Sequence, residues 1–275
     1  MPDMSPVFDC RDESQLLPGM RAARRAIGSG ELVVMPTDTV YGIAADAFSP
    51  AAVQRLLDAK GRGRQSPPPV LVAGITTLKA LVAEVPAEVE QLVGAFWPGG
   101  LTIVLPAQPS LTWDLGDTGG TVAVRMPAHP LALELLEDTG PLAVSSANLT
   151  GKAAAIMAHD ALAMLGDSVA VYLDAGPSKT GIASTIIDAT SLVGSGERAV
   201  RVLREGAVSR EELRDVIGDL LEPIDVDAAE QTAVDSEDTR DGAQPERAES
   251  ASAGSTEPEP ASAPEPEPDD AGGNA

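Results

Sequence analysis

The segment that begins at Val33 reads VVMPTDTVYGIAAD, an apolar run that stops at a proline and continues into a polar turn. The run predicts a buried strand, and Pro36 ends its pairing because proline has no backbone N–H to donate. Thr37, Asp38 and Thr39 can then bond the backbone or a ligand at the carboxyl end of the strand, where open α/β sheets hold small molecules. A capped turn without a ligand is the alternative interpretation.

Short apolar runs alternate with helical segments along most of the chain, which predicts an α/β fold. The clearest helix signals are an N-cap serine followed by proline at residues 49–50 and the capping box SREE at residues 209–212. Helices are expected over residues 12–28, 49–60, 76–96 with a break near Pro86, 129–139, 159–165 and 209–221. Strands are expected over residues 33–35, 70–74, 101–105, 121–127, 141–144, 169–173, 185–188 and 199–204.

The last fifth of the chain differs in kind from the rest. Residues 222–275 contain 16 acidic and two basic residues, repeated Glu-Pro steps and no aromatic residue. Such a segment buries too little apolar surface to offset the entropy of ordering, so we predict a disordered acidic tail after a folded domain of residues 1–221. The tail carries −14 of the net charge of −23, which leaves the predicted domain at −9.

Composition argues against several classes of protein. A net charge of −9 leaves no broad basic surface for a phosphate backbone, so strong nucleic-acid binding is not expected. The single cysteine, Cys10, excludes a disulfide within the chain and a cysteine-based metal site. The sequence has no apolar run of membrane-spanning length and no N-terminal signal pattern. We therefore expect a cytoplasmic protein that does not bind a membrane.

Positive charge is concentrated in the turn that follows the second predicted helix. Lys60, Arg62 and Arg64 are separated only by glycines and are followed by three prolines at residues 67–69. Glycine makes this backbone permissive, while lysine supplies a point charge and arginine a planar fork for phosphate oxygens. Two interpretations stay open, a solvated surface loop and a clamp for a triphosphate.

Two other strands end in groups that suit a ligand. One carries Arg125 near its end, and because an unpaired buried charge is strongly unfavourable, this residue requires either a protein carboxylate or an anionic ligand. The other runs directly into the sequence SSAN at residues 145–148. Its small hydroxyl and amide groups fit either a hydrogen-bonded turn or a small-molecule contact.

Seven motifs occur in a fixed order along the chain: PTDTVYGIAADAF, AKGR, WPGGLT, TVAVRMPAHP, SSAN, STIID and VLREGAVS. In this order they resemble the YrdC-type threonylcarbamoyl-adenylate synthase family, and the resemblance covers about residues 22–213. The sequence has neither a GxxxxGK[ST] phosphate loop nor a GxGxxG fingerprint. If the chain uses a nucleotide, it does so without those loops.

The resemblance implies a fold, a reaction and partners. The family fold is a twisted, open, mostly antiparallel α/β (α+β) sheet with flanking helices and a large concave cavity. Its enzymes condense L-threonine, bicarbonate or CO2, and ATP, with Mg2+, into threonylcarbamoyl-AMP and pyrophosphate. A partner transferase then moves the threonylcarbamoyl group to tRNA, where it forms N6-threonylcarbamoyladenosine. The chain resembles the short form of the family, because the acidic tail stands in place of a second globular domain.

The resemblance also assigns residues to the two substrates. Matches to the Lys-x-Arg and Ser-x-Asn signatures imply a catalytic and ATP-binding set made of Lys60, Arg62, Ser146 and Asn148. The ATP side further includes Arg64 from the cationic turn, Thr121 and Arg204. Threonine contacts are implied for Thr37, Arg125, Val144 and Ser184, with the threonine carboxylate as the anionic partner of Arg125. No metal-binding side chain is implied. The chain departs from many relatives in the GRQSPPP stretch, and from some relatives in lacking a histidine within residues 70–74.

The residue types fit this chemistry, because cations must face the phosphates when pyrophosphate leaves, and positioning with charge neutralisation supplies most of the catalysis. Two other functions stay open. One is an RNA-binding module on the same fold, which the charge of −9 disfavours. The other is a related carbamoyl-transfer or sugar-phosphate enzyme, which would differ in the acceptor it uses.

Overall fold

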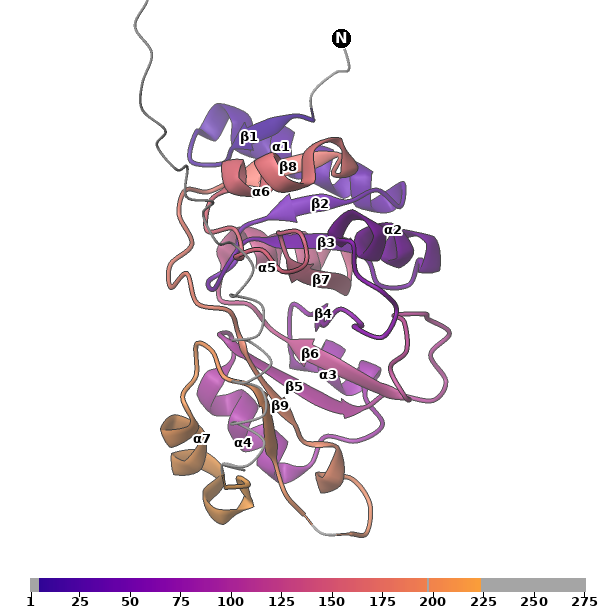
Figure 1. Cartoon of the computed structure of the whole chain (residues 1–275), viewed down its shortest axis with the longest axis vertical. Helices are drawn as coiled ribbons and strands as arrows, with labels where there is room; N and C mark the ends of the chain where they lie inside the picture. Colours follow the sequence, from indigo (N-terminus) through magenta and orange to yellow (C-terminus); the bar gives the residue numbers. More distant parts are fainter. Residues whose placement is uncertain (1–4, 197, 224–275) are drawn as a thin grey trace, which may run out of the picture. The chain divides into compact units, whose positions relative to one another are not determined.

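The structure is a computed structural model that describes residues 5–196 and 198–223. Ten strands in this part of the chain form one sheet in the order β1-β8-β2-β3-β7-β4-β6-β5-β9-β10 (Figure 1). Their bounds are β1 Val7–Asp9, β2 Val33–Met35, β3 Gly42–Asp46, β4 Val70–Leu71, β5 Leu101–Pro106, β6 Thr121–Arg125, β7 Leu142–Ser146, β8 Val171–Asp174, β9 Thr185–Asp188 and β10 Arg201–Arg204. The predicted acidic tail lies outside the described residues from residue 224 onward, so its disorder and the domain boundary stay predictions.

The sheet is open and mixed. Five of its nine neighbouring strand pairs are antiparallel and four are parallel. The predicted α/β class with a mostly antiparallel open sheet is therefore confirmed. At the middle of the strand order lies β4, which has two residues and connects β7 to β6.

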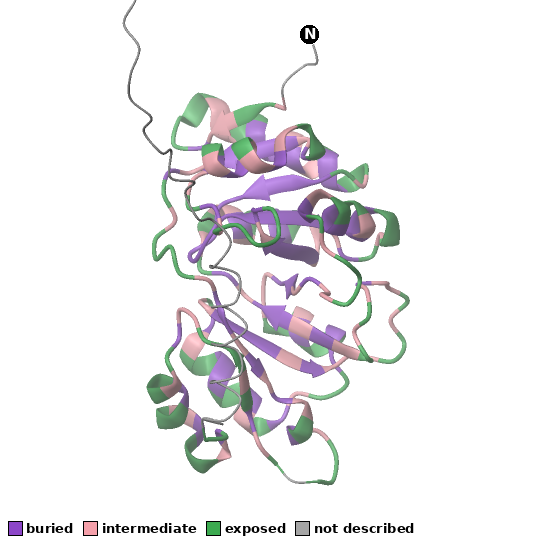
Figure 2. Cartoon of the chain, in the orientation of Figure 1, coloured by how far each residue is buried: buried purple, intermediate pink, exposed green. Residues whose placement is uncertain are grey.

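Helices cover both faces of the half of the sheet that contains β8, β2, β3 and β7. These helices are α1 Glu13–Gly28, α2 Pro50–Lys60, α5 Pro130–Thr139 and α6 Ala158–Leu165. Met20 of α1 and Leu135 of α5 share a core with Val33. Leu56 of α2 shares a second core with Val34, the next residue of β2, which points to the opposite face. The strands of this half are buried along nearly their whole length (Figure 2).

The half that contains β5, β6 and β9 has a helical cover on one face. The helices of this cover are α3 Ile75–Leu81, α4 Ala87–Phe96 and α7 Arg210–Ile217. Ile103 of β5, Val124 of β6 and Ile187 of β9 point into the core beneath them. Because successive side chains of a strand point to opposite sides, the alternate residues of the same strands are presented on the other face, where they form the candidate site.

The capping signals at Ser49 and Ser209 predict the starts of α2 and α7 correctly, and Asp12 caps α1. The side chain of Asp12 accepts a hydrogen bond from the backbone N–H of Ser14 at the start of α1, and Ser49 caps α2 through the N–H of Ala52. Ser209 and Glu212 form the expected capping box of α7. The helix predicted over residues 76–96 is divided into α3 and α4, and the break falls near Pro86 as expected.

The sequence does not signal β1 or β3. β3 has the sequence GIAAD, whose glycine and alanine residues have low strand propensity, yet it pairs with β2 on one side and β7 on the other. Gly42 is needed here because a Cβ at this position would lie 2.6 Å from Cγ1 of Val144. Tertiary packing therefore makes a central strand out of a segment that propensity alone does not mark.

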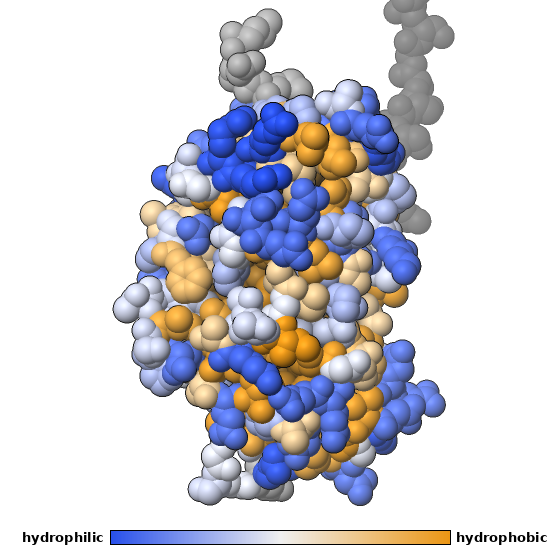
Figure 3. All heavy atoms as spheres, turned by 180° about the vertical axis from the view of Figure 1, so that it is seen from behind, coloured by the Kyte–Doolittle hydropathy of each residue, from blue (hydrophilic) through white to orange (hydrophobic). Residues whose placement is uncertain are grey.

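The outer surface of the described residues includes several large apolar side chains. None of the helices within them has the length and apolar character required to cross a bilayer. Large apolar side chains at the surface, such as Leu17 and Leu203, come from different elements, which is normal for protein surfaces. Seen from behind the view of Figure 1, strongly hydrophilic residues gather toward the upper end, with apolar residues interspersed below (Figure 3).

Candidate functional site

A cavity of about 290 Å³ lies on the face of β5, β6 and β9 opposite α3, α4 and α7. From these strands and their ends it is lined mainly by alternate residues, namely Thr102, Val104, Thr121, Ala123, Arg125, Ser184 and Ile186, together with Val122. The turn after β2, the proline-rich turn before β4 and the end of β7 supply further walls. Segments that are far apart in the sequence thus meet around one cavity. Because side chains alternate between the two faces of a strand, most residues that line the cavity differ from those that form the core.

The cavity wall carries positive charge. Arg62, Arg125 and Arg204 line it, and none of the lining residues within the described chain is an aspartate or a glutamate. This local excess of positive charge contrasts with the net charge of −9 for the predicted domain. Two of these guanidinium groups, Arg62 and Arg204, have no carboxylate partner among the described residues, and such groups suit a ligand that carries several anionic oxygens.

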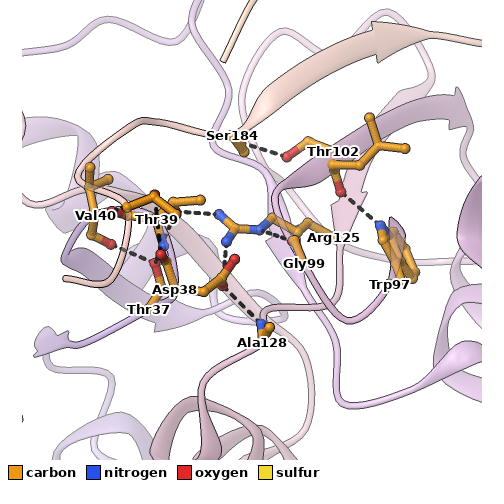
Figure 4. Close-up of polar contacts among 12 residues, drawn as sticks. Thr37, Asp38, Thr39, Val40, Trp97, Gly99, Thr102, Arg125, Ala128 and Ser184 are labelled. Atoms are coloured by element: carbon orange, nitrogen blue, oxygen red, sulfur yellow. Dashed lines mark hydrogen bonds and ion pairs between the residues drawn. The ribbon is translucent and has the colours of Figure 1, made fainter. Parts of the chain in front are cut away.

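Arg125 is held by three neighbours at the cavity wall (Figure 4). Its Nη2 donates to Oδ1 of Asp38 at 2.6 Å, its Nη1 donates to Oγ1 of Thr39 at 2.9 Å, and its Nε donates to the carbonyl oxygen of Gly99 at 2.8 Å. Oδ1 of Asp38 also accepts from the backbone N–H of Ala128 at 2.9 Å. Desolvation lowers the pKa of Arg125, and the neighbouring Asp38 carboxylate opposes this shift.

Of the two partners that the sequence allowed for Arg125, this structure shows the protein carboxylate. The side chains of Arg125 and Asp38 are 7% and 10% exposed, so the pair is almost entirely removed from solvent. A guanidinium has five N–H donors, and three are engaged by the described neighbours. Two donors therefore remain for a ligand, and the threonine contact of Arg125 stays a prediction.

Arg204 and Arg62 approach the cavity from different elements. Nη2 of Arg204 donates to the carbonyl oxygen of Ser184 at 2.7 Å and to Oγ of the same serine at 3.0 Å. Nη1 of Arg62 lies 3.4 Å from Oγ of Ser145, which is a long hydrogen bond. Desolvation, followed by the charge of Arg62, lowers the pKa of Arg204. Arg62 is thus loosely held, and most of its donors are available to an anion.

Lys60 is buried next to the cavity wall and is 1% exposed. Its Nζ donates to the carbonyl oxygen of Ser146, to the carbonyl oxygen of Asn148 at 2.7 Å and to Oδ1 of Asn148 at 3.2 Å. The three protons of the ammonium are therefore matched by three acceptors, which ties the end of α2 to the turn after β7. Burial, followed by the charge of Arg62, lowers the pKa of Lys60 to about 8.

We expect the free energy of unfolding to rise, relative to a Lys60→Met variant, as the pH increases from about 8 to 10.5. The unfolded chain keeps the ordinary lysine pKa of 10.5, so it binds more protons than the folded protein in this window and stability increases with pH. A shift of this size corresponds to about 3 kcal/mol. Urea unfolding at the two ends of the window measures the difference, with Lys79→Met as the control for loss of an exposed lysine. The same pH dependence in wild type and Lys60→Met would contradict the lowered pKa.

Arg64 pairs with two carboxylates of the segment between β5 and β6. Its Nη2 lies 2.6 Å from Oδ1 of Asp114 and its Nε lies 3.8 Å from Oδ1 of Asp117. A Cβ on Gly116, whose φ is +106°, would lie 2.6 Å from the carbonyl oxygen of Arg64, so only glycine fits this close approach. Arg64 is not among the residues that line the cavity, and its predicted ATP contact stays a prediction.

The structure brings most of the predicted site residues to one cavity. Those that line it are Thr37, Arg62, Thr121, Arg125, Val144, Ser146, Ser184 and Arg204. Lys60 and Asn148 form the adjoining network of hydrogen bonds. Thr39, which the sequence offered as a possible ligand contact in the turn after β2, also lines the cavity, and so does Thr102, to which sequence reasoning gave no role. The alternation of β5 was the available signal for Thr102, because it lies between the core residues Leu101 and Ile103.

Comparisons with known proteins match most of the described chain. The family model labelled Sua5_yciO_yrdC and described as telomere recombination matches residues 25–206. A protein of Mycobacterium tuberculosis with the provisional name threonylcarbamoyl-AMP synthase is 52% identical over 215 residues, which are 78% of this chain and 96% of that protein. The threonylcarbamoyl-AMP synthase of Pyrococcus abyssi is 40% identical over 204 residues, which are 73% of this chain and 58% of that protein.

A solved structure matches the fold as well as the sequence. The crystal structure of Pyrococcus abyssi Sua5 complexed with L-threonine has a TM-score of 0.68 and 38% sequence identity to this chain. The match covers 74% of this chain and 59% of the Pyrococcus protein. The chain therefore spans about three fifths of that solved protein and nearly the full length of the mycobacterial relative.

Proposed function

This chain belongs to the Sua5/YciO/YrdC family, and from that premise we propose that it is a threonylcarbamoyl-AMP synthase. It condenses L-threonine, bicarbonate or CO2, and ATP into threonylcarbamoyl-AMP and pyrophosphate. The names of the relatives from Mycobacterium, Pyrococcus and Bacillus support this reaction. The observation that carries the proposal is the cavity wall, which presents three guanidinium groups and no carboxylate among its described lining residues.

The reaction brings several anionic groups into one small space. A carbamate oxygen of N-carboxythreonine attacks the α-phosphorus of ATP, and the bond from that phosphorus to the pyrophosphate oxygen breaks. Negative charge on the phosphates then has to be met by cations that are already in position. We assign this task to Arg62 and Arg204, which are close enough for the charge of Arg62 to lower the pKa of Arg204. No strong general base is needed, because the carbamate oxygen is already anionic.

The threonine end of the cavity is proposed to lie at Arg125. Its two unengaged N–H donors suit a carboxylate, while Asp38 keeps the guanidinium in a fixed orientation. Thr37, Val144 and Ser184 line the cavity too and complete the proposed contacts. The complex of the Pyrococcus protein with L-threonine supports threonine as a substrate of this chain.

We propose that Mg2+ enters the site together with ATP. The described residues contain no group of three or more His, Cys, Asp or Glu side chains that would hold a metal ion, and the lining has no carboxylate. The phosphate oxygens of ATP are therefore the proposed ligands. Mg2+ would supply additional neutralisation of the phosphate charge beside Arg62 and Arg204.

Three finer assignments complete the proposal, two from the reaction and one from the sequence. The enzyme class is that of a nucleotidyltransferase, because an adenylyl group is transferred to the carbamate. The product is expected to pass to a transferase that modifies tRNA, since a mixed anhydride with AMP is an activated donor. A cytoplasmic location, expected from the sequence, stays a prediction.

Pyrophosphate release from ATP tests the proposal directly. Purified full-length protein with Mg2+ and bicarbonate is expected to release pyrophosphate only when L-threonine is added. Release with other acceptors but not with L-threonine would instead favour a related carbamoyl-transfer enzyme. Absence of release together with steeply salt-dependent tRNA binding would favour the RNA-binding module.

A further inference from the structure

Two hydroxyl groups that line the cavity are hydrogen-bonded to each other, and only one of them, that of Ser184, is among the proposed contacts. Oγ1 of Thr102, from β5, lies 2.9 Å from Oγ of Ser184, next to β9. Thr102 is 1% exposed and Ser184 is 7% exposed, and both line the cavity. The resemblance assigned Ser184 to threonine, whereas nothing has so far given a role to Thr102.

The neighbours of this pair determine what it can offer to a ligand. Nη2 of Arg204 donates to Oγ of Ser184 at 3.0 Å, and arginine has no acceptor. The two hydroxyls have two protons, and one of them is used in the bond between the hydroxyls. Neither hydroxyl has a further acceptor among the described residues. One O–H donor is therefore left over in the cavity, whichever of the two residues donates to the other.

The position of the pair indicates which ligand group receives this proton. Ile103 pairs with Val124 across β5 and β6, and the residues next to this pair, Thr102 and Arg125, both face the cavity. On the other side, Thr102 is the register partner of Ile186. The spare donor thus lies between the guanidinium groups of Arg125 and Arg204. An acceptor with negative charge suits this place best, because both neighbours are cations.

We propose that Thr102 is a substrate-binding residue whose hydroxyl, coupled to Ser184, donates a hydrogen bond to the carboxylate of the amino-acid substrate held by Arg125. This inference rests on the proposed function. With Ser184 donating to Thr102, the Thr102 hydroxyl carries the spare proton, and Arg204, which donates to Ser184 and has no acceptor, does not compete for it. The pair therefore offers a hydrogen-bond donor that favours an anionic acceptor over a group that can only donate.

The decisive variants are Thr102→Val, which removes the hydroxyl and keeps the branched shape, and Thr102→Ser, which keeps the hydroxyl. Thr102→Val is expected to raise KM for L-threonine about ten- to hundredfold, the loss associated with one hydrogen bond to a charged group. KM for ATP and kcat are expected to change little, because the contact is present in ground state and transition state alike. Thr102→Ser is expected to stay close to wild type. Thr139→Val is the matched control, since Thr139 bonds only backbone oxygens of α5 and its end.

Calorimetric titration of the full-length protein with L-threonine, without ATP, separates this inference from the proposed function. Weaker threonine binding in Thr102→Val than in Thr102→Ser and Thr139→Val supports the inference even if no variant releases pyrophosphate. Equal threonine affinity and equal KM in all variants overturn it while leaving the reaction in place. A wild-type protein that does not bind L-threonine overturns it as well. Melting temperatures near that of wild type show that the variants are folded.

Discussion

An Asp38→Ala variant is expected to lose about 3–5 kcal/mol of unfolding free energy, the usual result of removing one partner from a buried ion pair. The cause lies in Arg125, whose side chain is 7% exposed and would keep its charge without the carboxylate that neutralises it. The backbone N–H of Ala128 would also lose its acceptor. Urea unfolding of the full-length protein measures the loss.

A double-mutant cycle identifies the source of this loss. Arg125→Met removes the buried charge, so adding it to Asp38→Ala is expected to recover part of the stability rather than lower it further. Asp38→Asn keeps an oxygen near Arg125 and Ala128 but removes the charge, and it is expected to lie between wild type and Asp38→Ala. Losses that simply add in the double variant would show that the two side chains stabilise the fold independently, against the pairing seen in the structure.

Replacement of Arg62 by alanine is expected to lower kcat about 10²–10³-fold, the usual effect of removing one preorganised group that stabilises developing charge. The fold should be little affected, because the one hydrogen bond described for this side chain is the 3.4 Å contact with Ser145. Pyrophosphate release gives kcat and KM for ATP, and a thermal melt gives the stability.

Two further variants separate charge from geometry at this position. Arg62→Lys keeps the charge but loses the planar fork, so partial activity is expected. Arg25→Ala removes one positive charge from an exposed position on α1 and is expected to leave turnover unchanged. A normal kcat in Arg62→Ala would remove Arg62 from the catalytic set, whereas a large drop in melting temperature would show that it acts on the fold.

Local chemistry made much of the fold predictable from the sequence. Asp12, Ser49 and Ser209 each cap a helix through bonds to residues no more than three positions away, so their effect is visible in the sequence itself. β3 could not be found in this way. Apart from Ile43 its residues are poor strand formers, and the strand exists because β2 and β7 pair with it on both sides.

The sequence indicated which residues belong to the candidate site better than it indicated which neighbours those residues bond. Arg125 was expected to need an anionic partner, but the sequence could not select Asp38, which lies 87 positions away. Lys60 shows the same limit more strongly. Its position in the cationic turn suggested a phosphate contact, whereas its ammonium bonds residues 86 and 88 positions later in the chain. Contacts of this kind are decided by how strands and turns meet in space.

The one-sided helical cover of β5, β6 and β9 has an evolutionary consequence. Along β6, Val124 belongs to the core and does not line the cavity, Thr121, Ala123 and Arg125 line the cavity and lie outside that core, and Val122 belongs to both sets. Selection for a stable protein and selection for a particular ligand therefore act largely on different residues of the same short strand. During evolution, cavity-lining residues can be substituted to give a new ligand preference, while the residues of the hydrophobic core stay the same.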